Sequence, residues 1–226
     1  MKKVPVWLCL LFFSTLAWAA PPPAPPETKT DALQLTIRGE VDAAFAPTVG
    51  RITALYYECY PLLLKRFDHP QRPAARHVTF VFQRGLRVPA YCVGNELTIS
   101  IEWLTQHPQD IALVTHELTH VVQAYPAGGP GWLVEGIADY ARHQYGPPKQ
   151  PGWQLPDAFT AKQSYTDGYR TTAKFLVWLE EQHPGVVDKL HRRLQAREFA
   201  LSDFEAATGS SVEELWTACV AALNKP

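Results

Sequence analysis

The 226-residue chain lacks an excess of charge of one sign, a long apolar segment and a dense set of cysteines. Lys and Arg number 21 against 22 Asp and Glu, a balance that excludes binding to nucleic acid or to an anionic membrane through overall charge. The longest apolar run, near the N-terminus, is shorter than the ~20 residues that a membrane-spanning helix needs. Hydrophobic residues make up 46% of the chain, which excludes a largely disordered protein.

The four cysteines are spaced unlike the ligands of a zinc ribbon. Cys9 lies in the N-terminal apolar run, so Cys59, Cys92 and Cys219 are left for the folded domain. An odd number of cysteines in an exported protein allows one disulfide and leaves a free thiol. We favour a Cys59–Cys92 pair, because both residues lie in the N-terminal half of the chain. The alternative is three small buried side chains.

The first 19 residues have the layout of a cleavable signal peptide. Two lysines (residues 2–3) precede the apolar run (residues 6–16), and Ala-Trp-Ala (residues 17–19) supplies the small residues that signal peptidase recognises. Cleavage is expected after Ala19, because cleavage one residue later would place Pro21 next to the scissile bond. The alternative is an uncleaved anchor. We expect a protein exported to the periplasm or the medium, with no stable membrane insertion after cleavage.

The rest of the chain is expected to form a Pro-rich linker (residues 20–32) and one domain (residues 33–226). Strand patterns come first and helical patterns follow, a layout typical of the α+β class. The domain divides into a strand-rich lobe (about residues 33–124) and a helical lobe (about residues 125–226), and Pro61 is expected to bend or interrupt its helix. Strands are expected at residues 33–37, 78–82, 90–93 and 97–101, and helices at 48–67, 111–124, 132–144, 167–181 and 212–223.

Residues 116–120 read His-Glu-Leu-Thr-His, an H-E-x-x-H pattern inside a predicted helix. Residues four apart lie on one helical face, so the imidazoles of His116 and His120 can reach a single metal ion. Zn²⁺ accepts neutral histidine nitrogen well, and Glu117 lies where it can take a proton from a metal-activated water. The alternative is a surface helix with a solvated Glu117, but the apolar residues around the pattern predict a buried helix. Buried polar side chains need partners, and a metal supplies them.

A catalytic zinc usually has three protein ligands and one open position. Glu135 is the predicted third ligand, because the short Pro/Gly connection makes the next helix antiparallel and brings Glu135 level with His120. Asp139 then comes level with His116 and is predicted to accept its other ring N–H, which fixes the tautomer. The competing assignment makes Asp139 the ligand. Without a metal, Glu135 would be a carboxylate at a helix N-terminus, and Asp139 would pair with Arg142.

Five segments of the chain resemble the plant basic secretory proteins and their bacterial relatives. The specific ones are residues 116–123 and 132–142, which include Glu-Gly-Ile-Ala-Asp-Tyr, and the similarity extends to residues 94–97, 168–176 and 212–216. It therefore covers most of the domain. The resemblance implies a zinc peptidase with a zincin-like fold, and the pattern of two histidines and a glutamate is also that of the gluzincin peptidases. Unlike the plant proteins, this chain is not basic, so their name implies no partner for it.

An amide hydrolase also needs a donor that stabilises the oxyanion formed during attack. Tyr169 is the first candidate, Tyr165 and Tyr140 follow, and His143 is a further donor. The alternative is that Tyr169 packs as an aromatic core residue. In zincin-like folds an edge strand pairs with an extended peptide, and residues 96–101 are expected to be that strand. Four tryptophans either line a pocket or pack in the core: Trp103, Trp132, Trp153 and Trp178.

These expectations define an exported, zinc-dependent metallopeptidase that acts on a peptide or protein substrate as a monomer. One alternative is a non-catalytic zinc-binding module for envelope or wall material. The presence of Glu117 argues against it, since a structural zinc site more usually has four protein ligands. The other alternative is a zinc hydrolase of a non-peptide amide, which would use the same residues.

Overall fold

The computed structural model describes residues 32–126 and 129–225. The predicted signal peptide (residues 1–19) and the predicted linker up to residue 31 lie outside these residues. Within them, no helix is long and apolar enough to span a membrane.

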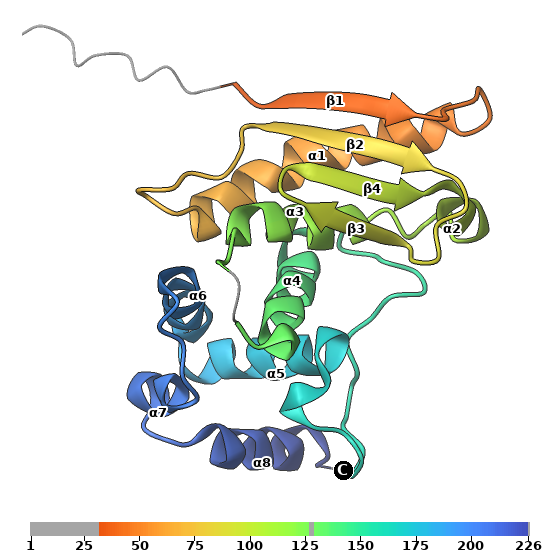
Figure 1. The fold of residues 1–226 in the computed structure, drawn as a ribbon. Helices are drawn as coiled ribbons and strands as arrows, with labels where there is room; N and C mark the ends of the chain where they lie inside the picture. Colours follow the sequence, from red (N-terminus) through yellow and green to blue (C-terminus); the bar gives the residue numbers. More distant parts are fainter. Residues whose placement is uncertain (1–31, 127–128, 226) are drawn as a thin grey trace, which may run out of the picture. The chain divides into compact units, whose positions relative to one another are not determined.

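A four-stranded mixed sheet forms the first part of the described chain (Figure 1). Its order is β1 (Gln34–Gly39), β2 (His77–Gln83), β4 (Glu96–Ser100) and β3 (Ala90–Val93). β1, β2 and β4 run parallel, and β3 pairs with β4 in the antiparallel direction through the turn predicted at Gly94. Gly94 has a φ of 62°, a conformation that residues with a Cβ rarely adopt.

The expectation that residues 96–101 form an edge strand is wrong. β4 lies between β2 and β3, and the edge strands of the sheet are β1 and β3. The buried residues of β4 reflect this interior position, whereas β3 alternates between exposed and partly buried residues. The strand also ends one residue early, because the Ser100 hydroxyl accepts a hydrogen bond from the Trp103 amide and begins the short helix α2 (Ile101–Gln106).

α1 (Ala46–Phe67) packs against the sheet through its apolar face (Figure 1). The Tyr56 ring meets the Phe80 ring edge-on, with a centroid distance of 5.7 Å. Pro61 does not interrupt this helix, contrary to one of the two expected outcomes. Pro61 is exposed, so water can reach the carbonyl that loses its hydrogen bond, while the neighbouring Tyr60 and Leu63 are fully buried.

The remaining elements are helical, as the sequence predicts for the second part of the chain. α3 packs against α1 and β3, α4 packs against α3, and α5 packs closely against α4. A single hydrophobic core continues from the sheet through these helices. The helices are α3 (Leu113–Gln123), α4 (Gly131–Tyr145), the 3₁₀ turn η1 (Tyr165–Asp167), α5 (Tyr169–Gln182), α6 (Val186–Ala196), α7 (Ser202–Thr208) and α8 (Val212–Leu223).

The close packing of α4 and α5 depends on Gly136. A Cβ at this position would lie 2.3 Å from the Thr172 Cγ2 atom and 2.6 Å from its Cβ. Thr172 is held in place because its hydroxyl donates a hydrogen bond to the Tyr165 carbonyl at 2.6 Å. Gly136 therefore allows the beginning of α5 to approach the helix that carries Glu135 and Asp139.

The predicted Cys59–Cys92 disulfide is wrong: Cys59, Cys92 and Cys219 are all free thiols. Cys59 lies in the core on α1, where the Thr115 hydroxyl approaches its sulfur at 3.7 Å. Cys92 lies on the edge strand β3 and faces a cavity. The two residues lie in the same half of the chain, but Cys59 is in the core and Cys92 lines the cavity, so their sulfurs do not pair.

Candidate metal centre

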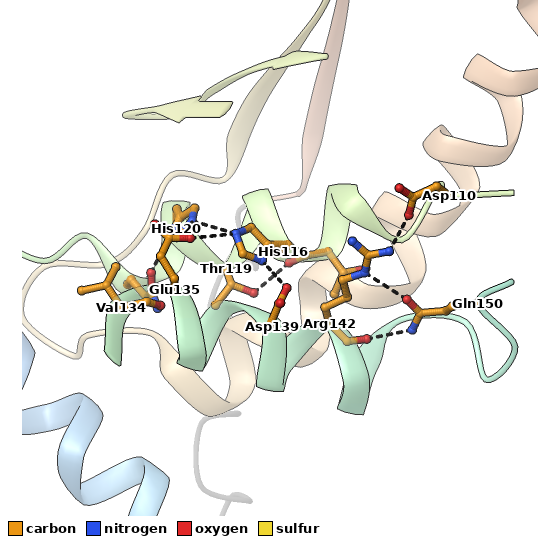
Figure 2. Close-up of polar contacts among 11 residues, drawn as sticks. Asp110, His116, Thr119, His120, Val134, Glu135, Asp139, Arg142 and Gln150 are labelled. Atoms are coloured by element: carbon orange, nitrogen blue, oxygen red, sulfur yellow. Dashed lines mark hydrogen bonds and ion pairs between the residues drawn. The ribbon is translucent and has the colours of Figure 1, made fainter. Parts of the chain in front are cut away.

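The candidate site is built on two helices that pack side by side, α3 and α4 (Figure 2). His116 is level with Asp139, and His120 is level with Glu135, so the two helices run in opposite directions, as the short connection predicts. α3 ends where Ala124 adopts a left-handed conformation with a φ of 40°. The reversal of the chain after Ala124 is what places the four side chains on facing surfaces.

His116, His120 and Glu135 form the group of possible metal ligands found among the described residues. The Glu135 Oε2 atom lies 3.1 Å from His116 Nε2 and 3.6 Å from His120 Nε2, and the two Nε2 atoms are 3.2 Å apart. Ligand atoms around a tetrahedral zinc with bonds of roughly 2.0–2.1 Å are separated by about 3.3 Å. The spacing of the three atoms is therefore consistent with a metal site.

In His116 and His120, the hydrogen bonds made by Nδ1 determine which ring nitrogen is free to bind a metal ion. His116 Nδ1 lies 2.7 Å from Asp139 Oδ1 (Figure 2). His120 Nδ1 lies 2.7 Å from Gln123 Oε1. Both oxygens accept, so both Nδ1 atoms carry a proton, and the two Nε2 atoms are the ring nitrogens left to bind a metal ion or a second proton. The two Nε2 atoms lie 3.2 Å apart, close enough for one cation to bind both. The donor set thus fits a divalent metal ion.

The pKa values of His116 and Glu135 also indicate that positive charge is favoured at this site. Burial alone would lower the pKa of His116, but hydrogen bonds to Asp139 and Glu135 outweigh it and raise this pKa to about 10. Burial would raise the pKa of Glu135, but the hydrogen bonds from His116 and His120 hold it at about 2. In the chain alone a proton on His116 supplies this positive charge, and a bound metal ion would replace that proton.

Glu117 lies next to the ligand group and lines the same cavity, with 8% of its surface exposed. Burial raises the pKa of its carboxyl group, His116 and His120 lower it, and Glu135 raises it further. A carboxyl group with a raised pKa beside a candidate metal site is suited to accept a proton and to pass it on.

Asp139 does not form the surface ion pair with Arg142 that was its alternative role. Arg142 instead binds Asp110, and its Nε donates to Gln150 at 3.0 Å (Figure 2). Asp139 is 3% exposed and hydrogen-bonds the side of the His116 ring that faces away from Glu135. This position favours Glu135 over Asp139 as the third ligand.

Among the candidate oxyanion donors, the structure places Tyr169 at the site. Its ring lies nearly parallel to the His116 ring, with centroids 6.1 Å apart, and 55% of the residue is exposed. The other candidates lie elsewhere: Tyr140 hydroxyl accepts from Arg66, and Tyr165 hydroxyl donates to Glu213. His143 lines a separate cavity.

A cavity of about 1420 Å³ opens over the ligand group. β3 contributes one wall, α3 and α4 contribute the wall with the ligand group, and Tyr169 and Arg170 lie where α5 begins. Of the four tryptophans considered, Trp103 and Trp153 line this cavity. Trp132 and Trp178 pack instead against Tyr165 and Phe175, respectively.

Gln123 also belongs to the site, because its side chain contacts His120, and it was not among the residues predicted from the sequence. One signal was present: Gln123 follows His120 by three positions and so lies on the same helical face. Its second partner, the Val134 carbonyl, is on α4, and no sequence pattern identifies such a contact.

The sheet followed by helices, with two histidines and a glutamate gathered on those helices, defines an α+β protein with a possible metal site. A comparison with curated proteins finds no match. The chain belongs to the BSP family, described as a peptidase of plants and bacteria, whose model matches residues 56–219. The match extends from the middle of α1 to α8 and includes the whole candidate site, and it confirms the resemblance seen in the sequence.

Proposed function

We propose that this protein is an exported, zinc-dependent metallopeptidase with a zincin-like fold that hydrolyses peptide bonds with water. The observation that carries the proposal is the meeting of His116, His120 and Glu135 ligand atoms 3.1–3.6 Å apart, with Glu117 in the same cavity. Membership of a peptidase family supports a protein substrate. Export rests on the signal-peptide pattern of residues 1–19.

His116, His120 and Glu135 would hold the zinc. Two neutral imidazoles and one carboxylate form a donor set that suits zinc and leaves one position open. A zinc ion bound there would supply Lewis-acid chemistry, polarising the scissile carbonyl and lowering the pKa of water. Asp139 orients the His116 ring for this task through the hydrogen bond to Nδ1.

Glu117 acts as the general base and then as the general acid. Its carboxylate accepts a proton from the water whose oxygen attacks the scissile carbonyl carbon. When the carbon–nitrogen bond breaks, the carboxyl group returns that proton to the leaving amine. The raised pKa of Glu117 makes its carboxylate a stronger base than an exposed one, which favours the first transfer, from water to Glu117.

The Tyr169 hydroxyl is proposed to donate a hydrogen bond to the oxyanion that forms on attack. Its exposed position beside His116 leaves the hydroxyl free to meet a substrate. Gly168 and Tyr169 both have positive φ values, 76° and 44°, in the turn that opens α5. This turn supports the proposal because it carries the Tyr169 ring beside the His116 ring.

β3 is proposed to bind the substrate backbone in place of β4. One side of β3 pairs with β4, so its other side offers main-chain donors and acceptors to an extended peptide. β3 packs against α3, the helix that carries Glu117, and residues 90–92 line the cavity. A peptide on this edge would pass over the ligand group.

The test is digestion of a peptide library by the zinc-loaded protein lacking residues 1–19, with products identified by mass spectrometry. Glu117→Gln should retain zinc and lose at least ~100-fold in activity, because a general base contributes about 10²–10⁴-fold. Glu58→Gln, an exposed change on α1, is the matched control and should cleave like the parent protein.

Zinc binding without cleavage of any peptide would favour a binding module or a hydrolase of another amide. Full activity in Glu117→Gln would contradict the role assigned to Glu117. Failure of the parent protein to bind zinc would contradict the proposed function as a whole.

A further inference from the structure

Gln123 is the last residue of α3, and 2% of its surface is exposed. Its side-chain amide makes two hydrogen bonds to different helices. Oε1 lies 2.7 Å from Nδ1 of His120, on α3 itself, and Nε2 donates to the carbonyl of Val134, on α4, at 2.9 Å. A buried amide with both ends occupied has little freedom to turn.

The Val134 carbonyl determines the orientation of the amide. A carbonyl oxygen can only accept, so the NH₂ end of Gln123 must face Val134 and the oxygen end must face His120. An amide oxygen also only accepts, so His120 Nδ1 must carry the proton. His120 Nε2, which lies 3.6 Å from Glu135 Oε2, is thereby the ring nitrogen left to bind a metal ion. The backbone of α4 thus determines the tautomer of a histidine on α3.

The Gln123 side chain also connects α3, which carries His120, to α4, which carries Glu135. Val134 directly precedes Glu135, so the same amide that orients His120 is bonded to the backbone beside the third ligand. We propose that Gln123 is a positioning residue of the metal centre, one that sets the His120 tautomer and the separation of His120 from Glu135. This inference rests on the proposed function of the site.

If Gln123 only stabilised the fold, its loss should affect stability and metal binding as the loss of any similar buried glutamine does. Gln195, near the end of α6, is a matched residue, because it is also 2% exposed and also uses both ends of its amide. It donates to the Phe67 carbonyl at 3.2 Å and accepts from Arg192 at 2.8 Å, and it does not line the site cavity. Loss of either amide should reduce stability, but only loss of Gln123 should weaken the metal site.

The experiment measures the zinc dissociation constants of Gln123→Met and Gln195→Met by competition with a chelator of known affinity. Thermal unfolding of the zinc-free proteins gives the effect on stability. Gln123→Met should bind zinc ~10–100-fold more weakly than the parent protein, the usual effect of losing a group that orients a metal-binding histidine. Gln195→Met should bind zinc within about twofold of the parent, since it leaves the His120 hydrogen bond in place.

Gln123→Glu keeps an acceptor for the His120 N–H and loses the donor to Val134. Its zinc affinity should therefore exceed that of Gln123→Met and stay within about tenfold of the parent's, which tests the inference even if the methionine variant does not fold. Parent-like affinity in Gln123→Met, or an equal loss in Gln195→Met, would overturn the inference while the parent still binds zinc. Absence of zinc binding by the parent would instead contradict the proposed function.

Discussion

Asp139 Oδ1 lies 2.7 Å from His116 Nδ1, on the side of the ring opposite to Glu135. The carboxylate is almost fully buried, and its hydrogen bond to His116 is the interaction that makes this burial tolerable. The pair joins α3 to α4 one turn away from the contact between His120 and Glu135. The orientation of His116 is therefore determined by the packing of two helices and not by its own helix alone.

Asp139→Asn should weaken zinc binding by ~10-fold or more, because a neutral amide makes the imidazole a poorer donor to the metal. The pKa of His116 in the zinc-free protein should also fall below its value of about 10, since the negative charge beside it is removed. Chelator competition and NMR titration of the histidine ring would measure the two effects. An unchanged zinc affinity would contradict the role proposed for Asp139.

Zinc should stabilise the folded protein, since the ligand group forms only when α3 and α4 pack together. At a zinc concentration 100 times the dissociation constant, the expected gain is ~2.7 kcal/mol, or a rise in melting temperature of about 5–10 °C. Addition of a chelator should reverse it. His120→Ala should show no such rise, and an equal rise in that variant would indicate zinc binding elsewhere.

Gly136→Ala should destabilise the protein by ~1–3 kcal/mol, because the added methyl group would overlap the Thr172 side chain. The displacement of α5 should also move Tyr169 away from His116 and lower activity. Gly131→Ala is the matched control on α4, since a Cβ at that position has no neighbouring atom within 4 Å. Urea denaturation of both variants would measure the difference, and equal stabilities would contradict this account of the contact.

His191 should make the protein less stable in mild acid. Its Nε2–H donates to the Phe67 carbonyl, and its Nδ1 accepts from the Tyr125 hydroxyl, both at 2.7 Å. Burial lowers the pKa of His191 from 6.5 to about 4, so the unfolded chain binds a proton here at a higher pH than the folded chain does. The free energy of unfolding should therefore fall by up to ~3 kcal/mol as the pH falls from about 6.5 to about 4.

The His191→Gln variant isolates this effect, because glutamine has no group that titrates in this range. Urea unfolding at several pH values should give a shallower dependence on pH for the variant than for the parent protein. Identical slopes would show that the stability lost in acid comes from other groups.

Local patterns predicted much of the fold. The helix predicted at residues 212–223 has those bounds in the structure, where Ser211 and Glu214 form a capping box at its start. The helix with the H-E-x-x-H pattern begins two residues later and ends one residue earlier than predicted. The turn after β3 was predictable as well, because Gly94-Asn95 favours a hairpin.

The errors concern contacts between distant segments. The sequence predicts a strand at residues 97–101, close to β4, but strand order depends on which neighbours pair, and β2 occupies the side of β4 that was expected to be free. The Cys59–Cys92 pairing failed for the same reason, since nothing local indicates that Cys59 faces the core and Cys92 the cavity. The Gln123–Val134 hydrogen bond is a third case.

The ligand-bearing helices α3 and α4 follow each other directly in the chain, and His116 and Glu135 are only 19 positions apart. The entropy lost in closing so short a segment is small, and it grows only slowly with segment length. The helical hairpin can therefore gather its donor atoms before β1 and β2 have found one another, since the paired residues Gln34 and His77 are 43 positions apart. A metal ion that binds this group would then bind the hairpin early in folding and favour its native register.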